Sequence, residues 1–356
     1  MNVLGIGAVF AGGIGIKCLQ EALVTGWQKP VDVKAKWAAN GKCPVYQANL
    51  DAVPDKTIFK KVRRADRLSK MAVICAADAV KDSGIRDINT EKVGVIVATA
   101  FGAHVTTFGF LDNILDFGET AVSPTIFSNS VHNAAASYVS SSLDIKGPTL
   151  TITQFRFSFQ SALQLALVWL QQKRCDYVLA GAVDQFGDVL CYVADQKLTT
   201  AQDGRIRPFV FTPTCQVPGE GAIFYILGRE KMEKTYCTVQ SVIINDNNSQ
   251  GAGTDVTIID ADGMLPDESA YLACADSGAL LAAYSPLFGT MMTGSAFNVA
   301  AGALMLSKQR YYPNPVQDNP RGLRILTDSR PAHIAAIECV GYDCHSTRAA
   351  VRLIAT

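Results

Sequence analysis

The sequence predicts an α/β protein in which helices cover both faces of buried strands. Residues 93–99 and 175–183 are almost wholly apolar, as in strands of a doubly covered sheet. Residues 64–83 place apolar side chains at helical spacing. Of the 356 residues, 49% are hydrophobic and 18% are charged, so the chain can bury a large core as one large or two medium domains.

Composition argues against several classes of protein. The 32 basic and 32 acidic residues cancel, so no charge excess indicates a nucleic acid or an anionic membrane as partner. Ten Cys show no CxxC and no zinc-type spacing, which indicates buried thiols in a reducing compartment and no metal. The N-terminus lacks the basic region of a signal peptide, so a cytoplasmic protein is expected.

The first elements follow in order. Residues 3–9 predict a strand and residues 18–24 a helix, with Gly12, Gly13 and Gly15 between them. These glycines do not have the GxGxxG spacing, so a nicotinamide site is disfavoured. Residues 30–60 look irregular. A helix over 64–83 should stop at Gly84, a strand should cover 93–99, and a loop should run from 101 to 124.

The centre of the chain is the stretch from Gly147 to Ala166. Thr149–Thr153 alternate hydroxyl and aliphatic residues, which predicts a half-buried strand, and apolar residues from Ser161 onward recur at helical spacing. Residues 154–160 must turn the chain from strand to helix. Such a turn puts one residue at a helix N-terminus, where an anionic nucleophile or an oxyanion is stabilised, and that residue is Arg156.

This stretch resembles the nucleophile segment of β-ketoacyl synthases. In that family the tenth residue counted from the Gly of the Gly-Pro pair is the catalytic Cys, and the same count from Gly147 gives Arg156. A guanidinium is neither a nucleophile nor a base. Other matching motifs are Asn133-Ala-Ala-Ala136, Ala-Gly-Ala at 180–182, Arg207-Pro-Phe with Val210 in place of the family's Asp, and Pro218-Gly-Glu-Gly-Ala222.

The resemblance covers the full length and implies a thiolase-like αβαβα layered fold made of two similar halves, residues 1–232 and 233–356. Further strands are expected at 238–244, 272–275, 289–293, 333–340 and 349–354. Residues 277–307 carry no charge and are long enough to span a bilayer, but Pro286, Gly289 and Gly294 divide them. A buried strand between helices is therefore preferred to a membrane span.

The resemblance also implies two catalytic His in the second half, and both are replaced. Asp262 stands at the first position and Ser295 at the second, with Thr290 at the family's Lys. Loss of the Cys and of both His indicates a chain that no longer condenses acyl groups. We expect Arg156 to pair with Asp262 and fill the vestigial pocket, since each charge would be costly to bury alone.

Two other residues are alternative nucleophiles. Cys344 precedes His345 in a loop that resembles the family's gating loop, with Tyr342 in the place of the gate aromatic. Ser158 lies at the expected helix start, but no GxSxG surrounds it. A buried thiol and a capping hydroxyl are the simpler interpretations.

Among β-ketoacyl synthases the chain most resembles the chain-length factor of type II polyketide synthases, a subunit without the Cys that forms a heterodimer with an active ketosynthase. The resemblance implies that substrates arrive as phosphopantetheine thioesters on an acyl carrier protein, with no other cofactor. Candidate tunnel and interface residues lie in the segment 123–143 and in the gating loop: Ile126, Phe127, Asn129, Val131, His132 and Tyr342. The alternatives are a divergent acyltransferase or thioesterase and a homodimeric module that binds the carrier protein.

Overall fold

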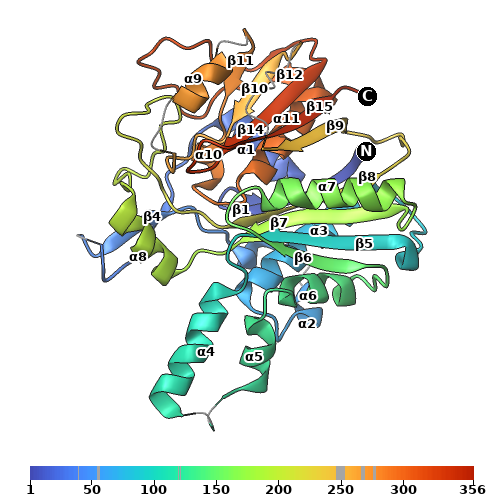
Figure 1. Cartoon of the computed structure of the whole chain (residues 1–356), viewed down its shortest axis with the longest axis vertical. Coiled ribbons are helices and arrows are strands. Elements are labelled where there is room, and N and C mark those ends of the chain that lie inside the picture. Colours follow the sequence, from blue (N-terminus) through green and yellow to red (C-terminus); the bar gives the residue numbers. More distant parts are fainter. Residues whose placement is uncertain are drawn as a thin grey trace.

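The structure is a computed structural model that describes residues 1–38, 40–53, 57–118, 120, 122–245, 253–265, 269–275 and 278–356. Within these residues a mixed sheet of 11 strands forms the centre of the molecule. Helices lie on both sides of its strands (Figure 1).

Ten of the 11 strands form two sets of five with the same order and directions. The first set runs β6 (Thr149–Thr153), β5 (Val93–Thr99), β7 (Tyr177–Asp184), β8 (Gly221–Gly228), β1 (Asn2–Phe10). The second runs β11 (Leu280–Ala282), β10 (Val256–Ile259), β14 (Ala336–Tyr342), β15 (Arg348–Ile354), β9 (Cys237–Ile244). In each set the first three strands are parallel and the last two are antiparallel to their neighbours. The two halves are therefore similar, although the boundary after residue 232 stays a prediction.

The two sets are joined where β1 pairs with β9; helices lie between them elsewhere and cover their outer faces. On β5, Val95 and Val97 pack in one core cluster with α3 (Arg67–Ser83) and α6 (Ala134–Ser142), whereas Ile96 and Ala98 pack in another with α7 (Ser158–Gln171). Both α7 and α11 (Ser295–Lys308) contact strands of both halves. On the far side, α9 (Ser269–Ala275) packs over the second half. These layers are the predicted αβαβα arrangement.

Local sequence explains the elements that were predicted best. All seven residues of β5 are buried, as their apolar run predicts. The helix expected over 64–83 begins at Arg67 because the Asp66 carboxylate accepts a hydrogen bond from the Ser69 amide at 2.9 Å and so caps it. It ends where predicted, because Gly84 adopts a left-handed conformation with φ 66°.

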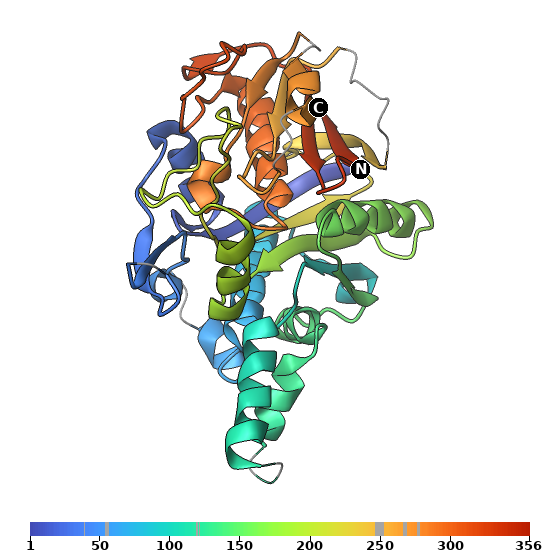
Figure 2. The same ribbon diagram turned by 60° about the vertical axis from the view of Figure 1, so that its left-hand side comes forward.

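The loop expected over 101–124 was a wrong prediction. A helix, α4 (His104–Phe117), occupies most of it and pairs with α5 (Pro124–Ser130). We call α4 and α5 together the arm, because these two helices project from the body of the molecule (Figures 1 and 2). The arm leads through α6 to β6, which is an edge strand of the sheet.

Three more predictions need correction. Leu272–Ala275 belong to the helix α9 and not to a strand. Residues 289–293 form a turn with one isolated bridge between Pro218 and Thr290, because Gly289 has φ 86° and ends α10 (Ser285–Phe288). Residues 30–60 are not wholly irregular, since β3 (Val31–Lys34) and β4 (Lys42–Val45) form an antiparallel hairpin.

The uncharged stretch folds as β11, α10 and the buried helix α11; Ser277 lies outside the described residues. Among the described helices, none combines the length and apolar character that crossing a bilayer requires. The remaining short elements are β2 (Gly13–Ile14), α1 (Ile16–Thr25), η1 (Leu50–Ala52), α2 (Ile58–Lys61), η2 (Thr90–Lys92), α8 (Asp188–Lys197), β12 (Arg310–Tyr311) and β13 (Arg330–Pro331).

Candidate functional site

The predicted turn from strand to helix exists and positions Arg156. β6 ends at Thr153 and α7 begins at Ser158, three residues before the expected start. Phe157 closes the turn in a left-handed conformation with φ 64°, which is uncommon for an aromatic residue, and its ring is buried. Arg156 therefore lies just before the helix, with a side chain that is only 15% exposed.

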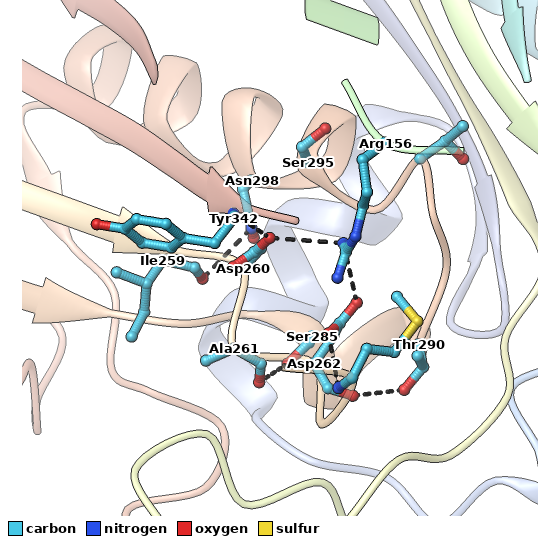
Figure 3. A network of polar contacts seen from close by, with 12 residues as sticks. Arg156, Ile259, Asp260, Ala261, Asp262, Ser285, Thr290, Ser295, Asn298 and Tyr342 are labelled. Carbon is cyan, nitrogen blue, oxygen red and sulfur yellow. Dashed lines mark hydrogen bonds and ion pairs between the residues drawn. The ribbon is translucent and has the colours of Figure 1, made fainter. Parts of the chain in front are cut away.

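The Arg156 guanidinium lies between two carboxylates (Figure 3). Its Nη1 is 3.6 Å from Oδ2 of Asp260 and 3.7 Å from Oδ2 of Asp262. Both aspartates directly follow β10, on either side of Ala261. The expected pair with Asp262 is thus present, and Asp260 is a second partner that the sequence analysis missed. The sequence feature that could have identified Asp260 is the Asp-x-Asp sequence that directly follows an apolar run.

Asp260 is held by further hydrogen bonds. The Tyr271 hydroxyl donates to its Oδ1 at 2.8 Å, and the Tyr342 amide donates to its Oδ2 at 3.1 Å. Tyr342 also packs edge-on against the Tyr271 ring, and its own ring is buried. The expected gate aromatic is therefore part of the wall that encloses the charges. A side chain at Gly341 would put its Cβ 2.9 Å from Asp260 Oδ2. This is closer than van der Waals contact allows, so the position requires glycine.

Burial and charge act against each other in this cluster. Burial raises the pKa of Asp260 and that of Asp262, and nearby Arg156 lowers both. The Asp260 charge then helps to bring the pKa of Asp262 to about 6. For Arg156, burial lowers the pKa, but Asp262 and Asp260 outweigh it and the pKa is raised. The arginine therefore stays charged beside the two carboxylates.

Ser295 and Thr290 form different hydrogen bonds near the Arg156 cluster. Ser295, the first residue of α11, lies near Arg156 in Figure 3, and its Oγ donates to Gln160 Oε1 at 3.4 Å. The Thr290 hydroxyl donates to the backbone oxygen of Asp262 at 2.6 Å and accepts from the Val217 amide at 3.1 Å. Thr290 therefore holds the loop that carries Asp262.

The alternative nucleophiles have no base in place. Cys344 and His345 are exposed on a turn, and the His345 amide donates to Asp343. Within the described residues no hydrogen bond joins the Cys344 thiol to the imidazole of His345. The Ser158 hydroxyl is buried and has no hydrogen-bond partner among the residues that the structure describes. Among the described residues, neither Cys344 nor Ser158 is hydrogen-bonded to the proton acceptor that an activated nucleophile needs.

An apolar cavity of about 430 Å³ borders this cluster. Met264 and Thr290 line it on the side of Asp262, and Phe101, Phe155 and Phe186 line it elsewhere. Asp184, also in its wall, accepts hydrogen bonds from the Thr99 hydroxyl and from the amides of Ala100 and Thr293. An apolar cavity therefore lies beside the charged cluster.

The candidate interface residues on the arm and just after it differ in exposure. Phe127, Val131 and His132 are exposed, and Ile126 is half-buried. Asn129 is buried in its own chain, where its Nδ2 donates to the Arg64 carbonyl and its Oδ1 accepts from the Tyr138 hydroxyl. Asn129 therefore fixes α5 in place.

Comparisons with known proteins identify the family. The family model "Beta-ketoacyl synthase, N-terminal domain" matches residues 1–232, so this chain belongs to the β-ketoacyl synthase family. Nodulation protein E of Rhizobium meliloti (strain 1021) is 29% identical over 236 residues, covering 65% of this chain and 58% of that protein. The putative polyketide β-ketoacyl synthase 1 of Streptomyces virginiae is 28% identical over 250 residues, covering 63% and 57%. The chain spans less than two thirds of the length of these curated relatives.

Solved structures confirm the thiolase-like fold. The ishigamide ketosynthase/chain length factor superposes with a TM-score of 0.80 at 14% identity and covers 100% of this chain and 98% of that one. The AntDE:AntF complex, a type II polyketide synthase acyl-carrier protein with its ketosynthase, gives 0.81 at 15% identity, covering 100% and 99%. The predicted family and fold class are therefore confirmed.

Proposed function

We propose that this chain is a non-condensing chain-length factor of a type II polyketide synthase, and that it forms a heterodimer with an active ketosynthase. The observation that carries the proposal is Arg156 at the nucleophile position, fixed between Asp260 and Asp262. A condensing enzyme needs a thiolate there to accept the acyl group, and a paired guanidinium cannot accept one. Asp262 and Ser295 likewise replace the imidazoles that would act on a thioester carbonyl.

Such a subunit would contribute by shaping the acyl tunnel of its partner. The edge of β6 is open, and Phe127, Val131 and His132, which precede β6 in the sequence, are exposed. Pairing of β6 with the partner's edge strand would cover the unpaired backbone groups of both. Residues of the arm would then close the far end of the partner's acyl tunnel, while an acyl carrier protein delivers the phosphopantetheine thioester to the active subunit.

The test is reconstitution with a cysteine-bearing ketosynthase of a type II polyketide synthase. We expect the two to purify as a 1:1 complex and to make a product that the ketosynthase alone does not make. The change Phe127→Ala should keep the complex and lengthen the product, because it removes a large exposed side chain from the proposed tunnel end. Met232→Ala, an exposed apolar position away from the arm, is the matched control. An unchanged product with and without this chain would contradict the proposal.

A further inference from the structure

The arm presents an apolar stripe that its own chain leaves uncovered. Phe108, Leu111 and Leu115 recur at spacings of three and four on α4, so they share one face of the helix. They are 36%, 46% and 82% exposed, respectively. On the inner side, α4 packs against α5 through Phe110 and Phe127, whose ring centroids are 5.6 Å apart. The arm is folded against itself and offers its outer face to a partner.

The charged side chains on α4 beside this stripe have one sign. Asp112 and Asp116 directly follow Leu111 and Leu115 in sequence, and both are exposed. Between Lys92 and Lys146 the sequence contains no Lys or Arg. Among the described residues, no ion pair contains Asp112 or Asp116.

Both aspartates also oppose the local electrostatics of α4. They are four residues apart, where like charges repel along a helix surface. They lie in its C-terminal half, near the negative end of the helix dipole. Helix stability would favour other residues at both positions, so their charge is better explained by what the arm contacts.

We propose that the arm is a charge-selective interface: Asp112 and Asp116 disfavour pairing with a second copy of this chain and fit a partner that places cationic side chains opposite them. In a twofold homodimer each subunit uses the same surface, so both acidic arms would enter an interface to which residues 93–145 bring no cation. Like charges brought together in an interface are strongly unfavourable, whereas opposite charges speed and orient association. This inference rests on the proposed function for the identity of the partner and adds why that partner is not a second copy.

Self-association of the purified chain tests the first part. Sedimentation velocity would compare the wild type with Asp112→Asn/Asp116→Asn at about 20 mM and about 500 mM NaCl. We expect the double variant to self-associate about tenfold more tightly at low salt, and high salt to strengthen self-association of the wild type. Glu230→Gln/Glu233→Gln removes two exposed acidic charges away from the arm and should behave as the wild type. Melting temperatures verify that both variants fold.

A wild-type homodimer that is as tight as that of the Asn variant, or that weakens in high salt, would overturn the inference. The second part is tested on the complex with the ketosynthase. There we expect Asp112→Asn/Asp116→Asn to weaken binding about tenfold and to remove most of its salt dependence. If the ketosynthase binds equally well with and without the two charges, the charge-selective interface is wrong and the heterodimer stands. If no ketosynthase binds at all, the proposed function fails, and the self-association result is still decided on the chain alone.

Discussion

In the proposed function, Arg156 makes a reactive position of the family into a structural one. A guanidinium in a buried turn requires nearby anions, because an unpaired buried charge is too costly. Asp260 and Asp262 supply them at 3.6 and 3.7 Å, and Tyr271 and the Tyr342 amide supply hydrogen bonds to Asp260. The residues that fill the site therefore depend on one another.

The change Arg156→Met should destabilise the fold by about 3 kcal/mol or more, because it leaves two buried carboxylates without their cation. Chemical denaturation measures the difference in unfolding free energy. Arg330→Met is the matched control: its ion pair with Asp328 has both side chains about half exposed, and its loss should cost less than about 1 kcal/mol. Equal costs for the two variants would show that the buried cluster does not hold the site together.

The pKa of Asp262 predicts an unusual pH dependence. Its pKa rises from 3.8 to about 6 on folding, so between these values the folded state binds more protons than the unfolded state. Its contribution to stability is present in full below pH 3.8 and is lost as the pH rises through about 6. Asp262→Asn should remove this loss, a difference on the order of 2 kcal/mol across that range.

Denaturation curves from pH 4 to pH 7 check this prediction. Asp78→Asn is a useful control, because burial, followed by the charge of Asp82, also raises the pKa of Asp78 to about 6. Each variant should remove the part of the pH dependence of the unfolding free energy that comes from its own carboxyl group. A stability profile that is the same for wild type and Asp262→Asn would contradict the assigned pKa.

Much of this site could be predicted from residues, and the exceptions have a common cause. The frame from Gly147 to the helix placed Arg156 at a helix start, and charge compensation predicted its pairing with Asp262. Asp260 and Tyr271 were missed because the first follows a strand that was not predicted and the second belongs to a helix read as a strand. Long-range partners depend on which elements meet in the fold, and local pattern does not encode this directly.

At the scale of elements, β6 is the strand on which assembly depends. It lies at the sheet edge, and Leu150 is 44% exposed on it. Leu150→Glu should leave the melting temperature nearly unchanged, because the site is open in the isolated chain. In the proposed heterodimer the same change would bury a charge and should weaken association by at least tenfold, or about 1.4 kcal/mol. Met232→Glu is the control; if both variants bind equally, β6 is not the interface strand.

Elements differed in how well the sequence predicted them. The bounds of β5 and β6 were predicted correctly, because period and β-branched content agree with their burial. The helix α4 was missed because Phe108, Leu111 and Leu115 face solvent in the isolated chain, so its apolar residues do not mark a buried side. The run Leu272–Ala275 is too short for periodicity to separate strand from helix, and there the strand prediction failed.

At the scale of the whole molecule, one buried carboxylate joins distant segments. Glu220, in the Gly-Glu-Gly-Ala motif, has no exposed side-chain surface and pairs with Arg67 of α3. It also accepts hydrogen bonds from the amides of Ala48 at 3.1 Å and Phe186 at 3.2 Å. The Gly-Glu-Gly-Ala motif therefore has a structural role that does not depend on condensation.

Glu220→Gln keeps the shape but removes the charge, so it should cost about 3 kcal/mol in unfolding free energy and leave Arg67 without its partner. Thermal or chemical denaturation measures this, and Glu233→Gln, an exposed position, should change stability by less than about 0.5 kcal/mol. A neutral effect of Glu220→Gln would mean that the motif is not kept for structure.

The central claim concerns the molecule as a whole: a condensing scaffold contributes shape, because its reactive centre is filled by Arg156, Asp260 and Asp262. The most direct measurement is intact-protein mass spectrometry after the purified chain is incubated with an acyl-phosphopantetheine thioester. We predict no gain in mass. A stoichiometric acyl adduct on Cys344, on Ser158 or on any other residue of the isolated chain would contradict the claim.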